Sequence, residues 1–229
     1  MRGAGRLLTA GAVGALLASC GSPGPAVDPS QLLRDGKKAI DSASAVHFTL
    51  TSKDVTGAGP LITGGDGNAR RPDGFSGTLN VVASGFTLAV DVVSTGGVFY
   101  ARTPLTNTFD KTDPSKYGFG DPGQLLDPNK GLSTLLADCS GATVKDSDRL
   151  NGEQLSEVSC SIPGDPVAKL LTSVDPSQAV AATVGVDAST HELRRVVLVG
   201  PFFDKSKPST FTVVLDKYGE NVSITPPAG

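Results

Sequence analysis

Two neighbouring apolar stretches, residues 77–83 and 86–93, constrain the fold more than any other part of the sequence. The second stretch alternates large apolar residues with smaller or polar ones, as a half-buried β-strand does. Its large residues are Phe86, Leu88, Val90 and Val92. Only Ser84-Gly85 separates the two stretches, so we expect an antiparallel hairpin. A turn at 95–97 leads to a third strand over 98–101, and such a meander builds antiparallel sheet.

Similar alternating stretches flank this hairpin. They predict strands at 46–52, 143–150, 153–162, 179–186, 193–199, 210–215 and 222–225. Asn151-Gly152 is typical of a two-residue hairpin turn, which would place Cys160 opposite Thr143. Between the first two strands, five glycines are expected to break the chain into turns: Gly57, Gly59, Gly64, Gly65 and Gly67. Residues 102–123 contain three prolines and are predicted to form a long loop, which would be either a functional edge or a poorly ordered stretch.

Three helices are predicted. The first covers residues 28–44, with Asp28 as its N-cap and Pro29 at its first position. Its apolar face would carry Leu32, Leu33, Gly36, Ala39, Ile40 and Ala43. An amphipathic helix can lie on a membrane, but the mixed charge and small apolar residues favour packing on a sheet. Shorter helices are expected around 132–136 and from Asp165 to about Val174.

The order of these elements indicates the fold class. One helix precedes several strands, then one or two central helices, then several more strands. This order favours an α+β fold with one broad, curved antiparallel sheet and helices on one face. A doubly wound parallel fold would require strands and helices to alternate throughout.

The N-terminus has the layout of a secretory signal peptide. Arg2 and Arg6 precede an apolar run over residues 7–18, which is too short to span a membrane. The run ends in Leu17-Ala18-Ser19-Cys20, which resembles the lipobox of bacterial lipoproteins. This resemblance implies that Cys20 carries a diacylglyceryl group and becomes the mature N-terminus. The alternative is an ordinary signal peptide with an incidental cysteine.

The remaining two cysteines form an even pair. Cys139 and Cys160 are expected to form a disulfide in an exported protein, the alternative being two buried thiols. If Cys160 faces Thr143, the chain before Thr143 has to fold back to bring Cys139 within reach.

The sequence carries no recognisable catalytic motif. His47 is near the start of a predicted strand and His191 lies between two strands, while six aspartates precede proline and so suit turns and helix starts. We therefore expect no enzyme activity, no metal site and no cofactor. A formal net charge of −3 and the lack of a basic cluster also argue against a nucleic-acid partner.

The space between a curved sheet and helices on its concave side can be either filled or partly empty. The helices either fill the space as a closed core or leave an apolar cavity, and the same residues would line both. Small residues such as Ala39, Ala43, Ala83 and Ala89 fill less volume and tilt the prediction slightly toward a cavity.

Three segments of the chain resemble the LppX/LprAFG lipoproteins of mycobacteria and their relatives. They are residues 125–132 (LLDPNKGL), 150–152 (LNG) and 215–222 (LDKYGENV), and Ala182-Thr183-Val184 with His191-Glu192-Leu193 falls where the family has a comparable strand pair. The resemblance covers about 28–227. The chain departs from the family in lacking Trp at the strand over 184–186 and at Tyr218.

The resemblance implies a half-barrel with helices on its concave face and a large cavity for the acyl chains of lipids or glycolipids. Residues 1–19 would be the signal peptide, 20–27 the lipidated N-terminus and tether, and 28–229 the lipid-binding domain. The protein would sit on the outer face of the cell membrane and carry lipid across the envelope, with an envelope transporter as a possible partner. The alternative is a structural or interaction lipoprotein with a closed core.

If the cavity exists, the period-two pattern nominates its walls. The sheet would contribute Leu79, Val81, Phe86, Leu88, Val90, Val92 and either Val98 or Phe99. The helices would contribute Leu132, Leu135, Leu136, Leu170 and Leu171. The polar head group of the lipid is expected near residues 102–123.

Overall fold

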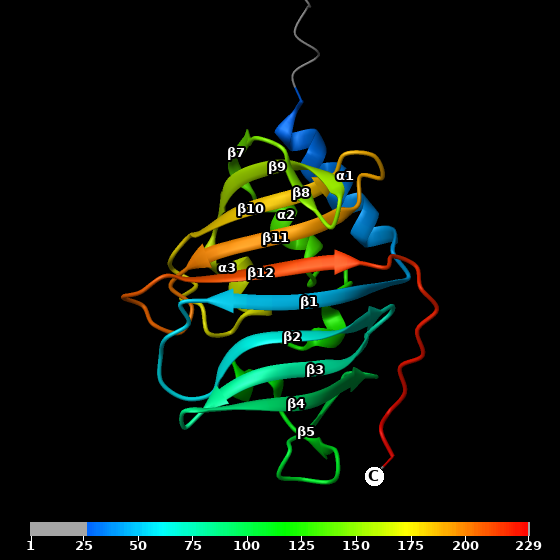
Figure 1. The fold of residues 1–229 in the computed structure, drawn as a ribbon, viewed down its shortest axis with the longest axis vertical. Coiled ribbons are helices and arrows are strands. Elements are labelled where there is room, and N and C mark those ends of the chain that lie inside the picture. The colour runs from blue at the N-terminus through cyan, green and yellow to red at the C-terminus, as the bar shows by residue number, and fades with distance from the viewer. Residues whose placement is uncertain (1–26, 229) are drawn as a thin grey trace, which may run out of the picture.

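The computed structural model describes residues 27–228 as one open antiparallel sheet with a few short helices (Figure 1). The predicted α+β class is confirmed. The predicted signal peptide and the predicted lipidation site, Cys20, lie outside the described residues. Twelve strands form the sheet in the order β6-β5-β4-β3-β2-β1-β12-β11-β10-β9-β7, and β8 pairs with β9.

The strands are β1 (Ala45–Lys53), β2 (Leu61–Arg70), β3 (Gly74–Ala83), β4 (Phe86–Thr95), β5 (Val98–Arg102), β6 (Asp110–Lys111), β7 (Ser140–Val144), β8 (Asp148–Leu150), β9 (Glu153–Ile162), β10 (Val180–Asp187), β11 (Leu193–Gly200) and β12 (Ser209–Asp216). The helices are α1 (Pro29–Ser42), α2 (Ser133–Ala137) and α3 (Gly164–Leu170), with 3₁₀ turns η1 (Pro114–Tyr117) and η2 (Pro122–Gln124).

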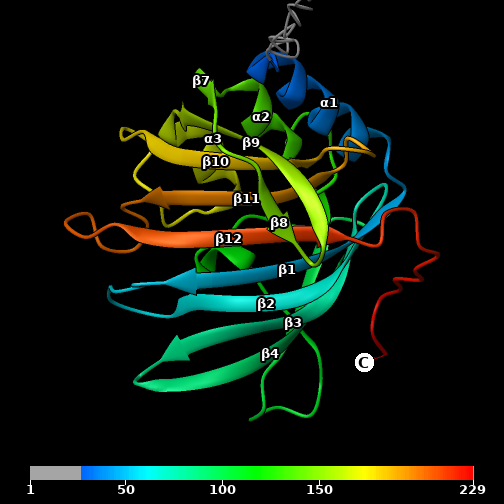
Figure 2. The same cartoon turned by 45° about the horizontal axis from the view of Figure 1, so that its top comes forward.

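The first and last strands meet in the middle of the sheet. β1 pairs with β12, and His47 is opposite Asp216. The strands β2–β6 extend the sheet on the β1 side, and β11, β10, β9 and β7 extend it on the β12 side. The sheet curves around the helices, as the turned view makes plain (Figure 2).

The first helix forms where the sequence predicts it. The Asp28 side chain accepts a hydrogen bond from the Ser30 backbone N–H, and Pro29 occupies the first turn. The helix packs on α2 and on β9–β11. Gly36 permits this close packing, because a Cβ atom there would lie 3.1 Å from Val186 Cγ2 and 3.3 Å from Leu136 Cδ2.

The prediction that Gly64, Gly65 and Gly67 form turns is wrong, because all three lie inside β2. Gly67 pairs with Gly77 of β3. A Cβ atom on Gly67 would lie only 2.6 Å from the Ser76 carbonyl oxygen, so the two strands approach more closely here than side chains allow. Glycine in this strand therefore serves close backbone contact rather than a change of direction.

Three other expectations need correction. Residues 102–123 are not structureless, since they contain β6, η1 and part of η2. The predicted strand at 222–225 is absent from the described chain, and Ile224 instead packs its side chain beside Gly74. Helix α3 ends at Leu170, earlier than Val174.

The structure joins Cys139 to Cys160 by a disulfide, with their Cα atoms 5.4 Å apart. The predicted register was off by one residue, because Thr143 faces Ser159 rather than Cys160. β7 and β8 are separate strands, and a further register shift falls between Ser140 and Thr143. These irregularities move Cys139 next to Cys160.

Polar side chains occupy the convex face of the sheet. His47 bridges three strands there: its Nδ1 lies 2.7 Å from Asp216 Oδ1, and its Nε2 lies 3.1 Å from Asp66 Oδ2. Further along, Asp91 accepts hydrogen bonds from Thr78 and Arg102. The Arg102 guanidinium lowers the pKa of Asp91. These cross-strand contacts give the convex face a solvated surface and leave the concave face to apolar residues.

The turn between β10 and β11 is fixed by a buried carboxylate. Asp187 Oδ1 accepts hydrogen bonds from the hydroxyl and backbone N–H of Ser189 and from the backbone N–H of Thr190. These donors hold the pKa of Asp187 at about 2, below its ordinary value of 3.8. Nearby, burial raises the pKa of Tyr218, whose hydroxyl donates to the Leu193 carbonyl.

Candidate functional site

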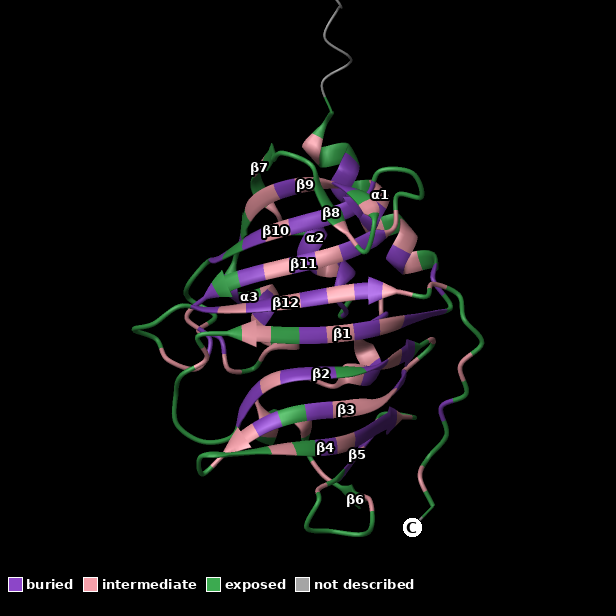
Figure 3. Cartoon of the chain, viewed as in Figure 1, coloured by how far each residue is buried: buried purple, intermediate pink, exposed green. Residues whose placement is uncertain are grey.

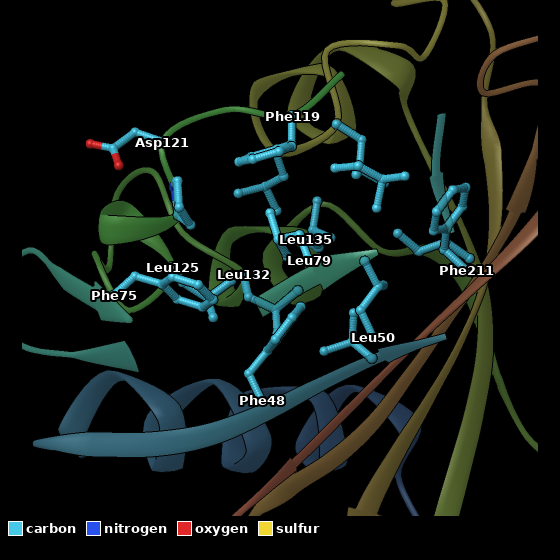
Figure 4. A pocket seen from close by; sticks show the side chains of 16 residues that line it. Phe48, Leu50, Phe75, Leu79, Phe119, Asp121, Leu125, Leu132, Leu135 and Phe211 are labelled. Atoms are coloured by element: carbon cyan, nitrogen blue, oxygen red, sulfur yellow. The ribbon is translucent and has the colours of Figure 1, made fainter. Parts of the chain in front are cut away.

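An apolar cavity of about 100 Å³ lies between the concave face of the sheet and the helices (Figure 4). Its lining is apolar except for one carboxylate. The lining residues are Phe48, Leu50, Ile62, Phe75, Leu79, Phe119, Asp121, Pro122, Leu125, Leu132, Leu135, Leu170, Leu171, Leu198, Phe211 and Val213.

The sheet contributes one wall through the period-two pattern of its central strands. Phe48 and Leu50 of β1 and Phe211 and Val213 of β12 are each two residues apart, so they point to the same face. The rings of Phe48 and Phe75 meet edge to face, with centroids 6.0 Å apart. The cavity is therefore centred where the first and last strands pair.

The glycines of β2 let lining side chains of β3 lie against the β2 backbone. Gly65 and Gly67 alternate with Asp66, which is exposed, so they share the buried face with Ala69. Gly65 pairs with Leu79 and with Leu50, both of which line the cavity. Gly65 and Gly67 carry no side chain, and side chains of β3 cover them: a Cβ atom on Gly65 would lie 2.6 Å from Leu79 Cδ2, and one on Gly67 would lie 3.0 Å from Phe75 Cζ.

The opposite wall comes from α2, α3 and the segment before them. Leu132 and Leu135 are fully or almost fully buried, while Leu170 and Leu171 at the end of α3 are partly exposed. Phe119, Pro122 and Leu125 complete this wall. Residues 117–125 thus cover part of the cavity, and we call them the covering segment.

Specific contacts hold the covering segment in place. The Ser94 hydroxyl, which is completely buried in β4, donates to Asp121 Oδ1. The Gly120 N–H donates to the Leu170 carbonyl at 2.9 Å, and the Phe119 and Phe99 rings pack edge to face with centroids 5.7 Å apart. Asp121 lies at the rim of the lining side chains, with its carboxylate turned away from them (Figure 4). The cavity therefore has an apolar interior and one anionic group at its rim.

The structure brings together five of the predicted cavity residues. Leu79, Leu132, Leu135, Leu170 and Leu171 line the cavity. Five others are buried in the core but do not line it: Val81, Val90, Val92, Phe99 and Leu136. Whether any of these residues contacts lipid stays a prediction.

The remaining predicted positions are at the margin of the half-barrel. Phe86 is 71% exposed, so its assignment to the cavity wall is wrong. It follows the β3–β4 turn, beyond the part of the sheet that the helices cover. Leu88 and Val98 are only partly buried and lie outside the lining. Phe99, rather than Val98, shares the inner face with the completely buried Ser94.

Sequence reasoning missed most of the sheet wall. Phe48, Leu50, Phe75, Leu198, Phe211 and Val213 all line the cavity. All but Phe75 lie within strands that the alternating pattern predicts, and Phe75 lies just before the predicted strand at 77–83. The missing information was the strand order, because β1 and β12 become neighbours only in the folded sheet.

The cavity is smaller than a ligand site of ordinary size. Pockets for small molecules start at roughly 300 Å³, about three times the volume found here. An acyl chain of membrane length therefore fits only if the covering segment or the lining side chains move apart.

These features define a class: an open antiparallel half-barrel that encloses an apolar cavity between its sheet and its helices. Residues 28–224 match the LppX_LprAFG lipoprotein family, and the chain belongs to this family. Across residues 27–228, no helix combines the length and apolarity needed to cross a membrane.

Relatives of known name cover most of the chain. The lipoarabinomannan carrier protein LprG of Mycobacterium tuberculosis (strain H37Rv) is 26% identical over 208 residues, which are 90% of this chain and 85% of LprG. The putative lipoprotein LprA of Mycobacterium tuberculosis (strain CDC 1551) is 30% identical over 217 residues, covering 87% of this chain and 82% of LprA.

Solved structures share the fold. LprF from Mycobacterium bovis superposes with a TM-score of 0.72 at 22% identity, covering 91% of this chain and all of LprF. LppX from Mycobacterium tuberculosis gives a TM-score of 0.62 at 16% identity, covering 86% of this chain and 98% of LppX. At these identities the two structures establish the fold alone.

Proposed function

We propose that this chain is a membrane-anchored lipoprotein that binds acylated lipid or glycolipid in its apolar cavity and helps to transfer it across the cell envelope. The observation that carries the proposal is the cavity itself, whose interior offers only apolar side chains. Membership of a lipoprotein family that includes a named lipoarabinomannan carrier supports it.

The driving force would be desolvation. Each acyl methylene moved from water to an apolar site contributes about 0.8 kcal/mol, so the cavity can compete with a bilayer only if it stays dry. The covering segment would help to keep it dry, because Phe119, Pro122 and Leu125 add apolar side chains to the lining. The head group would remain at the rim near Asp121, where a carboxylate can accept hydrogen bonds from hydroxyl groups.

The anchor would be Cys20, acylated at the mature N-terminus on the outer face of the cell membrane. Two or more acyl chains hold a protein on a bilayer stably, whereas one does not. The tether of residues 21–27 would span about 25 Å when fully extended, which allows loading at the membrane that supplies the lipid. An envelope transporter is a possible donor or acceptor. Fractionation tests the anchor: Cys20→Ala protein should leave the membrane, and full retention would exclude lipidation of Cys20.

The cavity is tested by filling it. In Leu79→Trp protein the larger indole would extend from the position of Leu79 into the cavity, so lipid recovered by organic extraction and mass spectrometry should fall. Val199→Trp is the matched control, because Val199 is on β11 and is 40% exposed. Circular dichroism would establish that both variants fold. Undiminished lipid in folded Leu79→Trp protein would refute the proposed site.

A further inference from the structure

One stretch of sheet edge lacks a partner. β5 pairs with β4 only over Asp91–Thr95 of β4, so residues 86–90 have β3 on one side and no strand on the other within the described chain. This half of β4 is largely pink and green in Figure 3, whereas the half that pairs with β5 is mostly purple. Among residues 27–228, no backbone hydrogen bond outside the β3–β4 ladder involves these five residues.

The turn geometry fixes which backbone groups are free. Ala83 and Phe86 flank the two-residue turn Ser84-Gly85, in which both residues have positive φ, and such a flanking pair exchanges two hydrogen bonds. Phe86, Leu88 and Val90 therefore bond to β3. Thr87 and Ala89 direct their N–H and C=O groups outward, which leaves two donors and two acceptors unpaired.

Other edges of the described sheet are protected. β6 is two charged residues long and covers Tyr100 and Ala101 of β5. β7 is five residues long and is interrupted by a register shift. The sequence Phe-Thr-Leu-Ala-Val at 86–90 contains no charge, proline or bulge, the devices by which natural sheet edges avoid pairing. Such an edge is suited to strand addition.

We propose that a second copy of this chain pairs with this edge, β4 against β4 in antiparallel orientation. The sequence is complementary to itself in one register, with Leu88 opposite Leu88 of the second copy. Thr87 then faces Ala89 of the second copy, and both such pairs are hydrogen-bonded, so all free groups of both edges are satisfied. Phe86 faces Val90 of the second copy on the apolar side of the sheet.

Charge and space favour this occupant. The nearest charged groups, Asp91 and Arg102, already form an ion pair at 2.7 Å and face each other in the β4–β5 ladder, so the pairing with the second copy ends at Val90. No like charges are brought together. A hollow of about 360 Å³ adjoins the edge, lined by Ala89, Asp91, Arg102, Thr103, Pro104, Thr106 and Asn107. The second copy's turn, Ser84-Gly85, carries small side chains and would enter at this position.

The proposed pairing is two-fold symmetric, which allows a test by cysteine cross-linking. Leu88 would be a non-hydrogen-bonded pair with Cα atoms about 4.5 Å apart, within disulfide reach. Thr87 would be displaced by two residues from Thr87 of the second copy, more than about 7 Å away and out of reach. Full-length Leu88→Cys and Thr87→Cys proteins, in the membranes of the expressing bacterium, would be oxidised with copper phenanthroline and run on non-reducing gels. We expect a species of twice the mass from Leu88→Cys as its main product, and none from Thr87→Cys.

A second variant tests the pairing of the β4 edge without an added cysteine. Ala89→Pro removes an outward N–H while leaving the β3 ladder intact, so the purified protein should fall from dimer to monomer mass in detergent by analytical ultracentrifugation. Ala89→Ser is the matched control and should stay dimeric. Equal cross-linking of both cysteine variants, no cross-link, or an adduct whose mass is not twice that of the chain would each overturn the proposal. Since lipid content is not involved, these results are independent of the proposed lipid binding.

Discussion

Leu135 offers a direct test of whether the cavity holds acyl chains. Its side chain is completely buried and lines the cavity, whereas Leu136, the next residue of α2, is 3% exposed and packs away from it, near Gly36. Replacing either by alanine removes the same atoms from the same helix. Only the space left by Leu135 would join the cavity.

The magnitude follows from the burial of both leucines. A buried Leu→Ala change costs about 2.7–5 kcal/mol, and the cost rises by about 24 cal/mol for each Å³ of cavity that the substitution leaves. In lipid-free protein both variants should therefore lose about 4 kcal/mol of unfolding free energy, or about 8–16 °C in Tm for a chain of this length.

Bound lipid should raise the stability of the two variants by different amounts. An acyl chain that fills the enlarged cavity restores contacts in Leu135→Ala, so lipid-loaded protein should recover most of the loss, while Leu136→Ala should recover none beyond the wild-type gain. The assay is urea unfolding of matched lipid-free and lipid-loaded samples, followed by circular dichroism. If lipid stabilises both variants equally, the chain does not occupy the space beside Leu135 and the assignment of the cavity is refuted.

Two further predictions concern stability. Because the folded-state pKa of Asp187 is about 2, its carboxylate stabilises the fold above about pH 4 and loses this effect as the pH falls through 2. Asp187→Asn should therefore lower the free energy of unfolding in urea by about 2 kcal/mol at pH 7 and by almost nothing at pH 2. An equal loss at both pH values would contradict a stabilising role of the ionised carboxylate. Replacing Cys139 and Cys160 together by serine should lower the free energy of unfolding by about 3 kcal/mol, since the disulfide closes a loop of 21 residues. A reductant should lower the stability of the wild-type protein by the same amount. If the reductant has no effect, the disulfide does not stabilise the fold.

Local sequence patterns predict the elements that depend on local chemistry. Asp28 and Pro29 begin α1 as expected, and Ser84-Gly85 joins β3 to β4 in the predicted hairpin. These features depend on capping, turn geometry and alternation within a few residues. The family resemblance and the fold class were likewise predictable and are confirmed.

Features that depend on strand neighbours were not predictable in this way. Gly65 and Gly67 look like turn residues until β3 is placed beside β2, where close backbone approach explains them. Phe86 alternates correctly with Leu88 and Val90 but extends past the helices, so alternation identifies its face and not its burial. Phe48 and Phe211 join one cavity only because β1 and β12 are adjacent, which no local pattern encodes.

The pairing of β1 with β12 also sets the order in which the protein can fold. The meander of β1–β5 and the run of β9–β12 each contain mainly pairs of consecutive strands, so each can form from its own residues. Pairing His47 with Asp216 instead requires closing a loop of nearly the whole domain, a slow contact of high sequence separation. A chain still being synthesised would hold two partial sheets with open apolar faces, exposed to aggregation until its last strand emerges. The cavity forms only at that final step. A chain truncated before Ser209 would therefore lack the cavity, and its two partial sheets would remain unjoined.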